Sequence, residues 1–93
     1  MSNPNRYDKI ITRLKETFDP VVCQLTDDSA SHAGHAGAST GAGHYILKIV
    51  CQQFEGLNRI SRHRLVYDSV GDMMHTEIHA LSIIALSPSE IPT

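Results

Sequence analysis

The segment Ser61-Arg-His-Arg-Leu-Val-Tyr-Asp-Ser-Val70, which continues to Ile78-His-Ala-Leu-Ser-Ile-Ile-Ala-Leu86, decides how this chain folds. Its first part places five residues at intervals of three and four, as along one face of a helix: His63, Val66, Tyr67, Val70 and Met74. Its second part is a strongly apolar, β-branched run, which is typical of a buried strand. The segment therefore predicts a helix with a packed apolar face, followed by a strand that has His79 at its start.

Length and composition limit the chain to a small protein. With 93 residues, of which 41% are hydrophobic, it can bury one modest core, so we expect residues 1–93 to form a single domain. The net charge of −2 gives no reason to expect a nucleic acid or an acidic membrane as the default partner. No apolar run approaches the roughly 20 residues of a membrane span, and the N-terminus lacks the apolar core of a signal peptide. We expect a soluble, cytoplasmic protein, with the mitochondrion as the alternative.

One further helix and two further strands are predicted before this segment. Residues 4–18 carry a single apolar stripe, which predicts a surface helix that packs on a sheet, and Asp19-Pro20 would end it. Residues 21–27 alternate in the manner of a strand, and residues 45–51 are nearly all apolar.

The connecting segments complete the predicted order. Residues 52–56 turn the chain, residues 57–60 connect to the second helix, and residues 73–75 begin another short helical turn. Residues 88–93 are a tail in which two prolines oppose further strand. The order αββααβ predicts an α+β fold, with helices packed on one face of a three-stranded mixed sheet.

The strand order also predicts which histidines meet. If the last strand runs parallel to the second through a right-handed crossover, both strands begin at the same end of the sheet. His44 and His79 would then be neighbours.

The loop between the first two strands, residues 28–43, is the most unusual part of the sequence. It is rich in Gly, Ala and Ser, and it is much longer than a hairpin connection needs. Three histidines lie in it or at its end: His32, His35 and His44. We expect a mobile loop whose histidines carry the function. A flexible linker with chance histidines, or a loop that captures divalent metals adventitiously, is the alternative.

Four motifs resemble those of the BolA family: Phe54-Glu-Gly56, Arg62-His-Arg-Leu-Val-Tyr67, Ile78-His-Ala-Leu81 and Ser87-Pro-Ser-Glu90. They occur in order and at the family's spacing, and the resemblance runs from the first helix to Glu90. The chain is therefore identified as a member of that family. The resemblance implies a fold similar to class II KH domains, and it implies complexes with monothiol glutaredoxins in which the partners share a [2Fe-2S] cluster. For some bacterial members it also implies regulatory DNA binding.

The resemblance further implies the cluster ligands. His79 matches the family's histidine at the start of the last strand, and a His or Cys of the loop supplies the second ligand. His44, His32 and His35 compete for this second role, with His44 and His32 ahead of His35. Two imidazoles can hold one iron of such a cluster, as in Rieske centres, and the other iron would take thiolates from the glutaredoxin cysteine and glutathione. We expect no cofactor in the isolated chain, which would be a monomer alone and a heterodimer with its partner.

Cys23 and Cys51 fall in predicted strands without Cys-x-x-Cys spacing, so we expect reduced thiols that act as small hydrophobes. No nucleophile and base pair can be recognised, so we do not expect an enzyme.

A basic patch offers a second hypothesis. Arg59, Arg62, His63 and Arg64 could contact the phosphates of DNA or an acidic partner surface. The segment lacks interleaved aromatic residues and the second glycine of the KH backbone clamp. The leading prediction is a non-enzymatic glutaredoxin-binding adaptor in iron-sulfur cluster trafficking or in iron or redox sensing. The alternative is a KH-like DNA-binding regulator.

Overall fold

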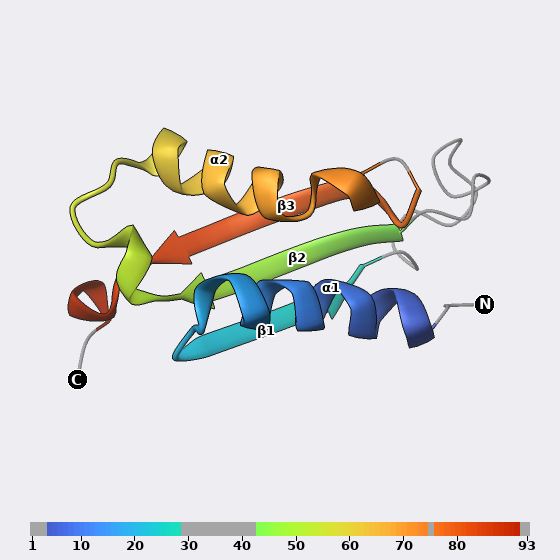
Figure 1. Cartoon of the computed structure of the whole chain (residues 1–93), viewed down its shortest axis with the longest axis horizontal. Coiled ribbons are helices and arrows are strands. Elements are labelled where there is room, and N and C mark those ends of the chain that lie inside the picture. Colours follow the sequence, from blue (N-terminus) through green and yellow to red (C-terminus); the bar gives the residue numbers. More distant parts are fainter. Residues whose placement is uncertain (1–3, 29–42, 75, 92–93) are drawn as a thin grey trace.

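The structure is a computed structural model that describes residues 4–28, 43–74 and 76–91. Its elements, in chain order, are α1 (Pro4–Phe18), β1 (Val22–Asp27), β2 (Gly43–Val50), the 3-10 turn η3 (Gln52–Phe54), α2 (Arg59–Ser69), the 3-10 turn η4 (Gly71–Met73), β3 (Ile78–Leu86) and the 3-10 turn η5 (Pro88–Glu90) (Figure 1). The predicted α+β class is confirmed. Among the described residues, no helix has the length and apolar character to cross a membrane.

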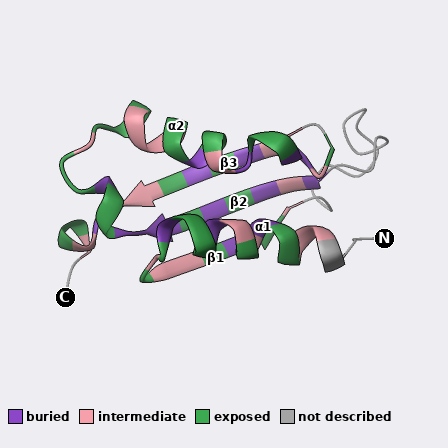
Figure 2. Cartoon of the chain, viewed as in Figure 1, coloured by how far each residue is buried: buried purple, intermediate pink, exposed green. Residues whose placement is uncertain are grey.

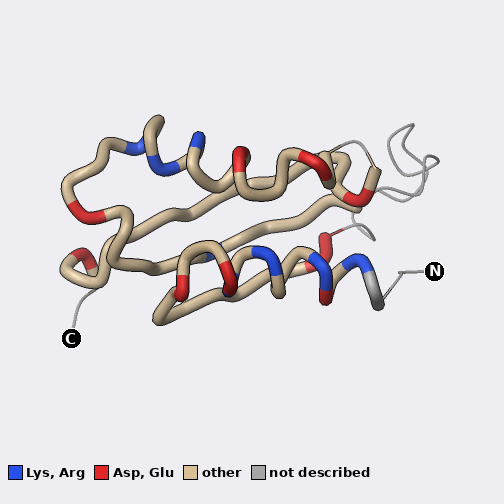
Figure 3. The backbone as a smooth tube through the Cα atoms, in the orientation of Figure 1, with Lys and Arg blue, Asp and Glu red and all other residues tan. Residues whose placement is uncertain are grey.

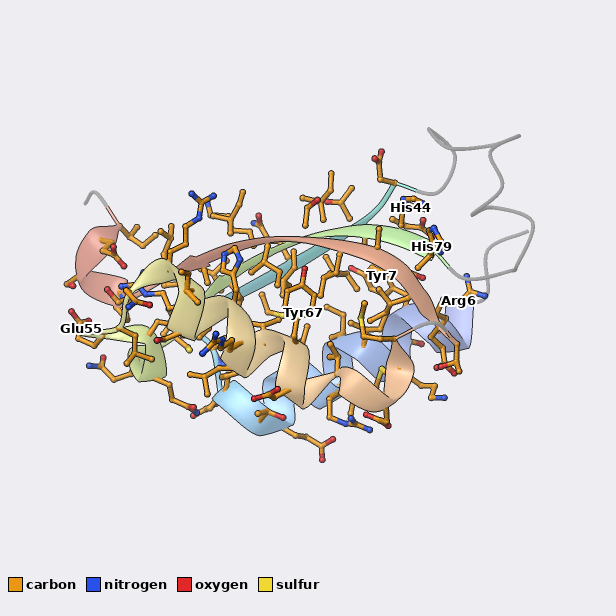
Figure 4. All side chains as sticks on the ribbon, turned by 90° about the horizontal axis from the view of Figure 1, so that it is seen from above. Arg6, Tyr7, His44, Glu55, Tyr67 and His79 are labelled. Atoms are coloured by element: carbon orange, nitrogen blue, oxygen red, sulfur yellow. The ribbon has the colours of Figure 1, made fainter. Side chains whose placement is uncertain are left out.

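The three strands form one mixed sheet in the order β1-β2-β3. β1 pairs antiparallel with β2, and β2 pairs parallel with β3, so β2 and β3 begin at the same end. Both helices cover one face of this sheet (Figures 1 and 4). The predicted parallel pairing of the last two strands is therefore confirmed.

The core lies between the sheet and the two helices (Figure 2). The apolar stripe of α1 and the alternate residues of β2 meet there, as the sequence pattern predicts. The most deeply buried of these side chains are Ile10, Leu14, Leu47 and Ile49, each fully enclosed, and Phe54 after β2 packs on Phe18 with ring centroids 5.5 Å apart.

Two ion pairs fasten α1 to the chain that precedes β3. Arg13 donates to the carboxylate of Asp72 and to the carbonyl of Ser69, and Lys9 donates to Glu77 at 2.8 Å. The hydrogen bonds from Arg13 and Lys9 hold the pKa values of the Asp72 and Glu77 carboxyls below their usual range. Because Glu77 directly precedes β3, the start of this strand is fixed to α1.

Several predicted boundaries were wrong by a few residues. β2 begins at Gly43 rather than Tyr45, so His44 lies inside the strand. α2 begins at Arg59 rather than after Ile60, because the Asn58 side chain accepts a hydrogen bond from the backbone of Ser61 and caps the helix. The second short helical turn is η4, which starts at Gly71 rather than at the predicted Met73.

Tyr67 was predicted on the buried face of α2, and this was wrong. The side chain is 40% exposed, and its hydroxyl donates to the carbonyl of Leu81 on β3 at 2.9 Å. The buried positions of the predicted face are Val66 and Val70. Tyr67 therefore covers the edge of the sheet instead of filling the core.

Other predictions lie partly or wholly outside the described residues. Apart from Asp28 and Gly43, this applies to the loop at residues 28–43, including His32 and His35. It also applies to His75 and to residues 92–93. The start of the predicted tail is part of the fold, because η5 is closed by a capping box between Ser87 and Glu90.

Candidate metal centre

Two histidines meet where β2 and β3 begin. In the parallel pairing Gly43 is opposite Ile78, and His44 is opposite Ala80. His79 is therefore an extra residue on β3 without an opposite number on β2, and the register shifts at this point. This is a β-bulge, a device that re-aims a side chain at the end of a strand.

The bulge explains how His79 reaches the surface next to a buried strand start. Ile78 and Leu81 are both buried, although residues three apart in a regular strand face opposite sides of the sheet. The extra residue at the bulge shifts the alternation of side chains by one position, so both Ile78 and Leu81 can face the core. Ile78 anchors β3 in the core, while His79 is exposed beside the half-buried His44.

The two imidazoles are close enough to act together. Their ring centroids are 4.9 Å apart and the planes are inclined by 48°. Figure 4 shows both rings at one end of the sheet. At this separation each ring can turn a nitrogen toward one metal ion, and imidazole nitrogen is a ligand for iron as well as for zinc. The prediction that His44 and His79 would be neighbours is confirmed, and ligation by them stays a prediction.

The backbone around the pair is held from both sides. The N–H of Gly43 donates to the carbonyl of Glu77 at 3.1 Å, and the N–H of Asp28 donates to the carbonyl of His44 at 2.8 Å. These bonds join the three chain segments that approach the histidines. The position of the rings therefore depends on contacts with β1, β2 and the segment before β3.

Tyr45 supports the same end from inside. Its ring packs against Gly43, where an added Cβ would lie 2.7 Å from the ring atom Cε2. Burial raises the pKa of the Tyr45 hydroxyl, while a hydrogen bond with Arg6 of α1 acts in the opposite direction. Only glycine fits beneath this ring without moving it. Gly43 and Tyr45 together therefore set the position of His44.

The described residues supply only two ligands at this place. No group of three or more His, Cys, Asp or Glu side chains that could hold a metal ion occurs within residues 4–28, 43–74 and 76–91. His32, the other candidate ligand, lies outside these ranges. Two imidazoles suit a site that a second protein completes.

The two thiols of the chain are not part of this end. Both are free, as predicted, and Cys23 pairs with Ile49 while Cys51 directly follows β2 at its far end. Burial raises the pKa of each thiol, which disfavours the thiolate that binds metals. Any thiolate ligands beside His44 and His79 must therefore come from another molecule.

The basic patch is smaller than predicted. Arg62 is only 11% exposed, and its guanidinium donates to the carbonyls of Leu57 and Ala85 and forms an ion pair with Glu90 at 2.6 Å. It is a structural residue and not an exposed cation. Arg59 and Arg64 are exposed and His63 is half-buried, so the DNA-binding alternative stays a prediction that rests on these three (Figure 3).

Sequence reasoning missed the side chains that support the histidines and the sheet edge. Arg6, Tyr45 and Tyr67 were not assigned to a site, because their roles depend on contacts across the fold. The sequence signal at Gly43 was only its place directly before His44 and the strand. A glycine next to a candidate ligand was the one clue that could have been followed.

The chain is thus a small α+β protein, with two α-helices on one face of a three-stranded mixed sheet and two histidines where its parallel strands begin. The chain belongs to the BolA family: the family model described as BolA-like protein matches residues 14–90.

Comparisons with individual relatives support this family assignment. The chain is 40% identical over 92 residues to "Protein BOLA1, chloroplastic" of Arabidopsis thaliana, covering 96% of this chain and 58% of that protein. It is 40% identical over 88 residues to "SufE-like protein 1, chloroplastic/mitochondrial" of the same plant, covering 89% of this chain and 24% of that protein. The structure of the BolA domain of SufE1 from Arabidopsis thaliana superimposes with a TM-score of 0.85 at 38% identity, over 97% of this chain and 100% of that one.

The chain thus spans just over half of the first of these relatives and about a quarter of the second. The activities of these longer proteins are therefore not attributed to this chain. The names of both plant proteins refer to organelles, and the compartment of this chain stays a prediction.

Proposed function

We propose that this chain is a non-enzymatic adaptor that binds a monothiol glutaredoxin and shares a bridging [2Fe-2S] cluster with it through His79 and His44. The observation that carries the proposal is the approach of the two imidazoles to 4.9 Å where β2 and β3 begin. The family resemblance supplies the partner and the type of cluster. The same adaptor would serve in iron-sulfur cluster trafficking or in iron or redox sensing.

The donor set supports this proposal. Two imidazoles on one iron, with thiolates on the other, is a known ligand combination for a [2Fe-2S] cluster. The two cysteines of this chain lie elsewhere, so the glutaredoxin cysteine and glutathione would supply the thiolates. In this arrangement the chain contributes ligands and docking contacts, and it catalyses no reaction.

The ligand pair is also suited to release. His79 is exposed, and each imidazole must be neutral to bind iron. A cluster held at the surface by two such ligands can be passed on or lost when conditions change. His32 is retained as the alternative second ligand, because it lies outside the described residues.

The test is anaerobic reconstitution of the cluster on a mixture of this chain, a monothiol glutaredoxin and glutathione. Visible absorption and circular dichroism would be compared for the wild type and for His79→Ala, His44→Ala and His32→Ala. We expect His79→Ala to lose the spectrum of the mixed complex and to leave that of the glutaredoxin homodimer. His44→Ala should have the same effect if His44, and not His32, is the second ligand.

His63→Ala is the matched control, because it removes a half-buried imidazole from α2, well away from the pair. It should leave the mixed spectrum unchanged. An unchanged spectrum in His79→Ala would rule out the assignment of His79 as a ligand.

A further inference from the structure

A second surface feature lies at the opposite end of β3 from the histidines. It is a hollow of about 390 Å³ between α2 and β3, lined by Leu57, Arg59, Arg62, His63, Ile83, Ile84, Ala85, Leu86 and Glu90. We refer to it as the α2–β3 groove. Ala85 lies six positions after His79 along β3, which is roughly 20 Å at the rise of a strand. The groove is therefore separate from the candidate metal centre.

The walls of the groove are aliphatic and its rim is basic. Leu57 is half-buried near the start of α2, and the buried Ile83 lies on the strand side, while the 49% exposed Ile84 alternates with it and turns toward the other face of the sheet. Arg59 and His63 are four residues apart on α2, so they lie on the same face of the helix. An apolar wall next to basic groups is suited to a ligand that carries both aliphatic and acidic groups.

The charges of the groove do not cancel. Arg62 and Glu90 form an ion pair within it and neutralise each other. Within the described parts of the chain, the side chains of Arg59 and His63 have no hydrogen-bond or ion-pair partner. The groove is therefore a local positive site on a chain whose net charge is −2. An acidic ligand would supply the missing counter-charge.

The backbone edge of β3 is partly closed to other strands. The carbonyl of Leu81 accepts from the Tyr67 hydroxyl, and the carbonyl of Ala85 accepts from Arg62 at 3.0 Å. A peptide that added to this edge as a further strand would compete for both carbonyls. The groove must therefore recognise a ligand mainly through side chains.

We propose that the α2–β3 groove binds an acidic segment of a partner protein, with a carboxylate on Arg59 and His63 and an aliphatic side chain against Leu57. A nucleic acid fits less well. Among the residues that line the groove, His63 alone carries an aromatic ring, so successive bases of a strand would have no row of rings to stack on. This site is independent of the histidine pair and of the cluster proposed there.

Fluorescence anisotropy at low salt tests the proposal with three labelled probes. The first is an octapeptide in which glutamate alternates with leucine, the second is the same peptide with glutamine for glutamate, and the third is an octathymidylate strand. Binding would be measured for the wild type, Arg59→Ala, His63→Ala and Arg64→Ala. Arg64 is the matched control, because it is exposed on α2 and does not line the groove.

We expect the glutamate peptide to bind, and the glutamine peptide to bind about tenfold more weakly, as for the loss of one charge-assisted hydrogen bond. Arg59→Ala should weaken the glutamate peptide by a similar factor, His63→Ala by less, and Arg64→Ala should have no effect. Heteronuclear NMR spectra would check that each variant is folded and that Leu57 shifts on binding.

Four results would overturn the proposal. Equal weakening by Arg64→Ala would mean that only the general charge of α2 matters. Binding of octathymidylate as strong as that of the glutamate peptide would identify a nucleic-acid surface. Failure of the glutamate peptide to bind, or a concentration-dependent signal that showed self-association to fill the groove, would exclude an acidic partner segment.

Discussion

The two ends of β3 hold polar groups in opposite ways. At the start of the strand, which we call the histidine end, His44 and His79 bring two like groups together at the surface. At the other, the arginine end, Arg62 and Glu90 bring opposite charges together, and Arg62 is almost fully enclosed. Figure 1 shows β3 running along the sheet between these two ends.

This difference distinguishes side chains that stabilise the fold from side chains that can bind a ligand. At the arginine end the polar groups pair with one another or with the backbone: Arg62 donates to two backbone carbonyls and to Glu90, which also accepts from the backbone and hydroxyl of Ser87. Such a network closes the fold, and Arg62 and Glu90 themselves have little left to offer a ligand. Two imidazoles cannot neutralise each other as an acid and a base do, but both can bind the same metal ion. We therefore expect mutations of Arg62 and Glu90 to affect stability and mutations of His79 to affect binding.

The largest effect is expected for Arg62→Ala. It removes three hydrogen bonds, two of them to carbonyls that nothing else in the described structure would satisfy, so we expect a loss of about 3 kcal/mol in the free energy of unfolding. Urea denaturation followed by circular dichroism measures it. Arg64→Ala, which removes the same charge from an exposed site, should change stability by less than about 0.5 kcal/mol. Similar losses in both variants would show that Arg62 matters only as a charge.

Gly43→Ala should have the next largest effect, at the histidine end. The new Cβ would lie 2.7 Å from the buried ring of Tyr45, which has to move, so we expect a loss of about 1–2 kcal/mol. The shift should also weaken the NMR cross-peaks between the rings of His44 and His79. Gly71→Ala is the control, because nothing lies within 4 Å of the added atom and it should be neutral or slightly stabilising. Unchanged cross-peaks in Gly43→Ala would show that Gly43 does not position the pair.

The histidine end could be anticipated from the sequence, although its details could not. The order of the elements and the strand pattern alone predicted that His44 and His79 lie at the starts of two neighbouring parallel strands. The bulge was not predictable, because apolar residues on both sides of His79 are consistent with a regular strand. The early start of β2 at Gly43 depends on Tyr45 and Glu77, which meet this glycine only in the folded chain.

The arginine end was predicted wrongly for a related reason. Arg62 reads as one of several exposed cations on a helix, and Glu90 as part of a tail after the last strand. The ion pair joins residues 28 positions apart, and no local pattern indicates it. Tyr67 was misplaced in the same way, since its acceptor, Leu81, lies on another element. Periodicity identifies which face of a helix is apolar, but it does not identify the residues that lean from the border of that face onto a neighbouring strand.

A smaller effect at the arginine end should depend on pH. The backbone N–H of Ser87, with Arg62 and the Ser87 hydroxyl, lowers the pKa of Glu90 to about 2 from its usual 4.5. A carboxyl whose pKa is lower in the folded state adds stability above the unfolded value and loses it as the pH falls through the folded value. The stability difference between the wild type and Glu90→Gln should therefore be full above about pH 5 and disappear toward pH 2.

Urea denaturation at several pH values between 6 and 2 measures this difference. Asp68→Asn is the control, because Asp68 is exposed on α2 and is not part of this network. Its effect on stability should stay nearly constant over the same range. A difference for Glu90→Gln that did not shrink on acidification would mean that the carboxylate charge is not what stabilises η5.

The smallest effect on stability is expected for His79→Ala, and it is the sharpest test of the contrast between the ends. The His79 side chain is exposed on an extra residue of the strand, and Ile78 keeps β3 anchored without it, so the free energy of unfolding should change by less than about 0.5 kcal/mol. The same variant should abolish the mixed cluster spectrum, so that folding and binding separate in one substitution. A loss of more than about 2 kcal/mol would instead make His79 a structural residue like Arg62, because the two rings would then stabilise the fold themselves and have no need of a shared metal.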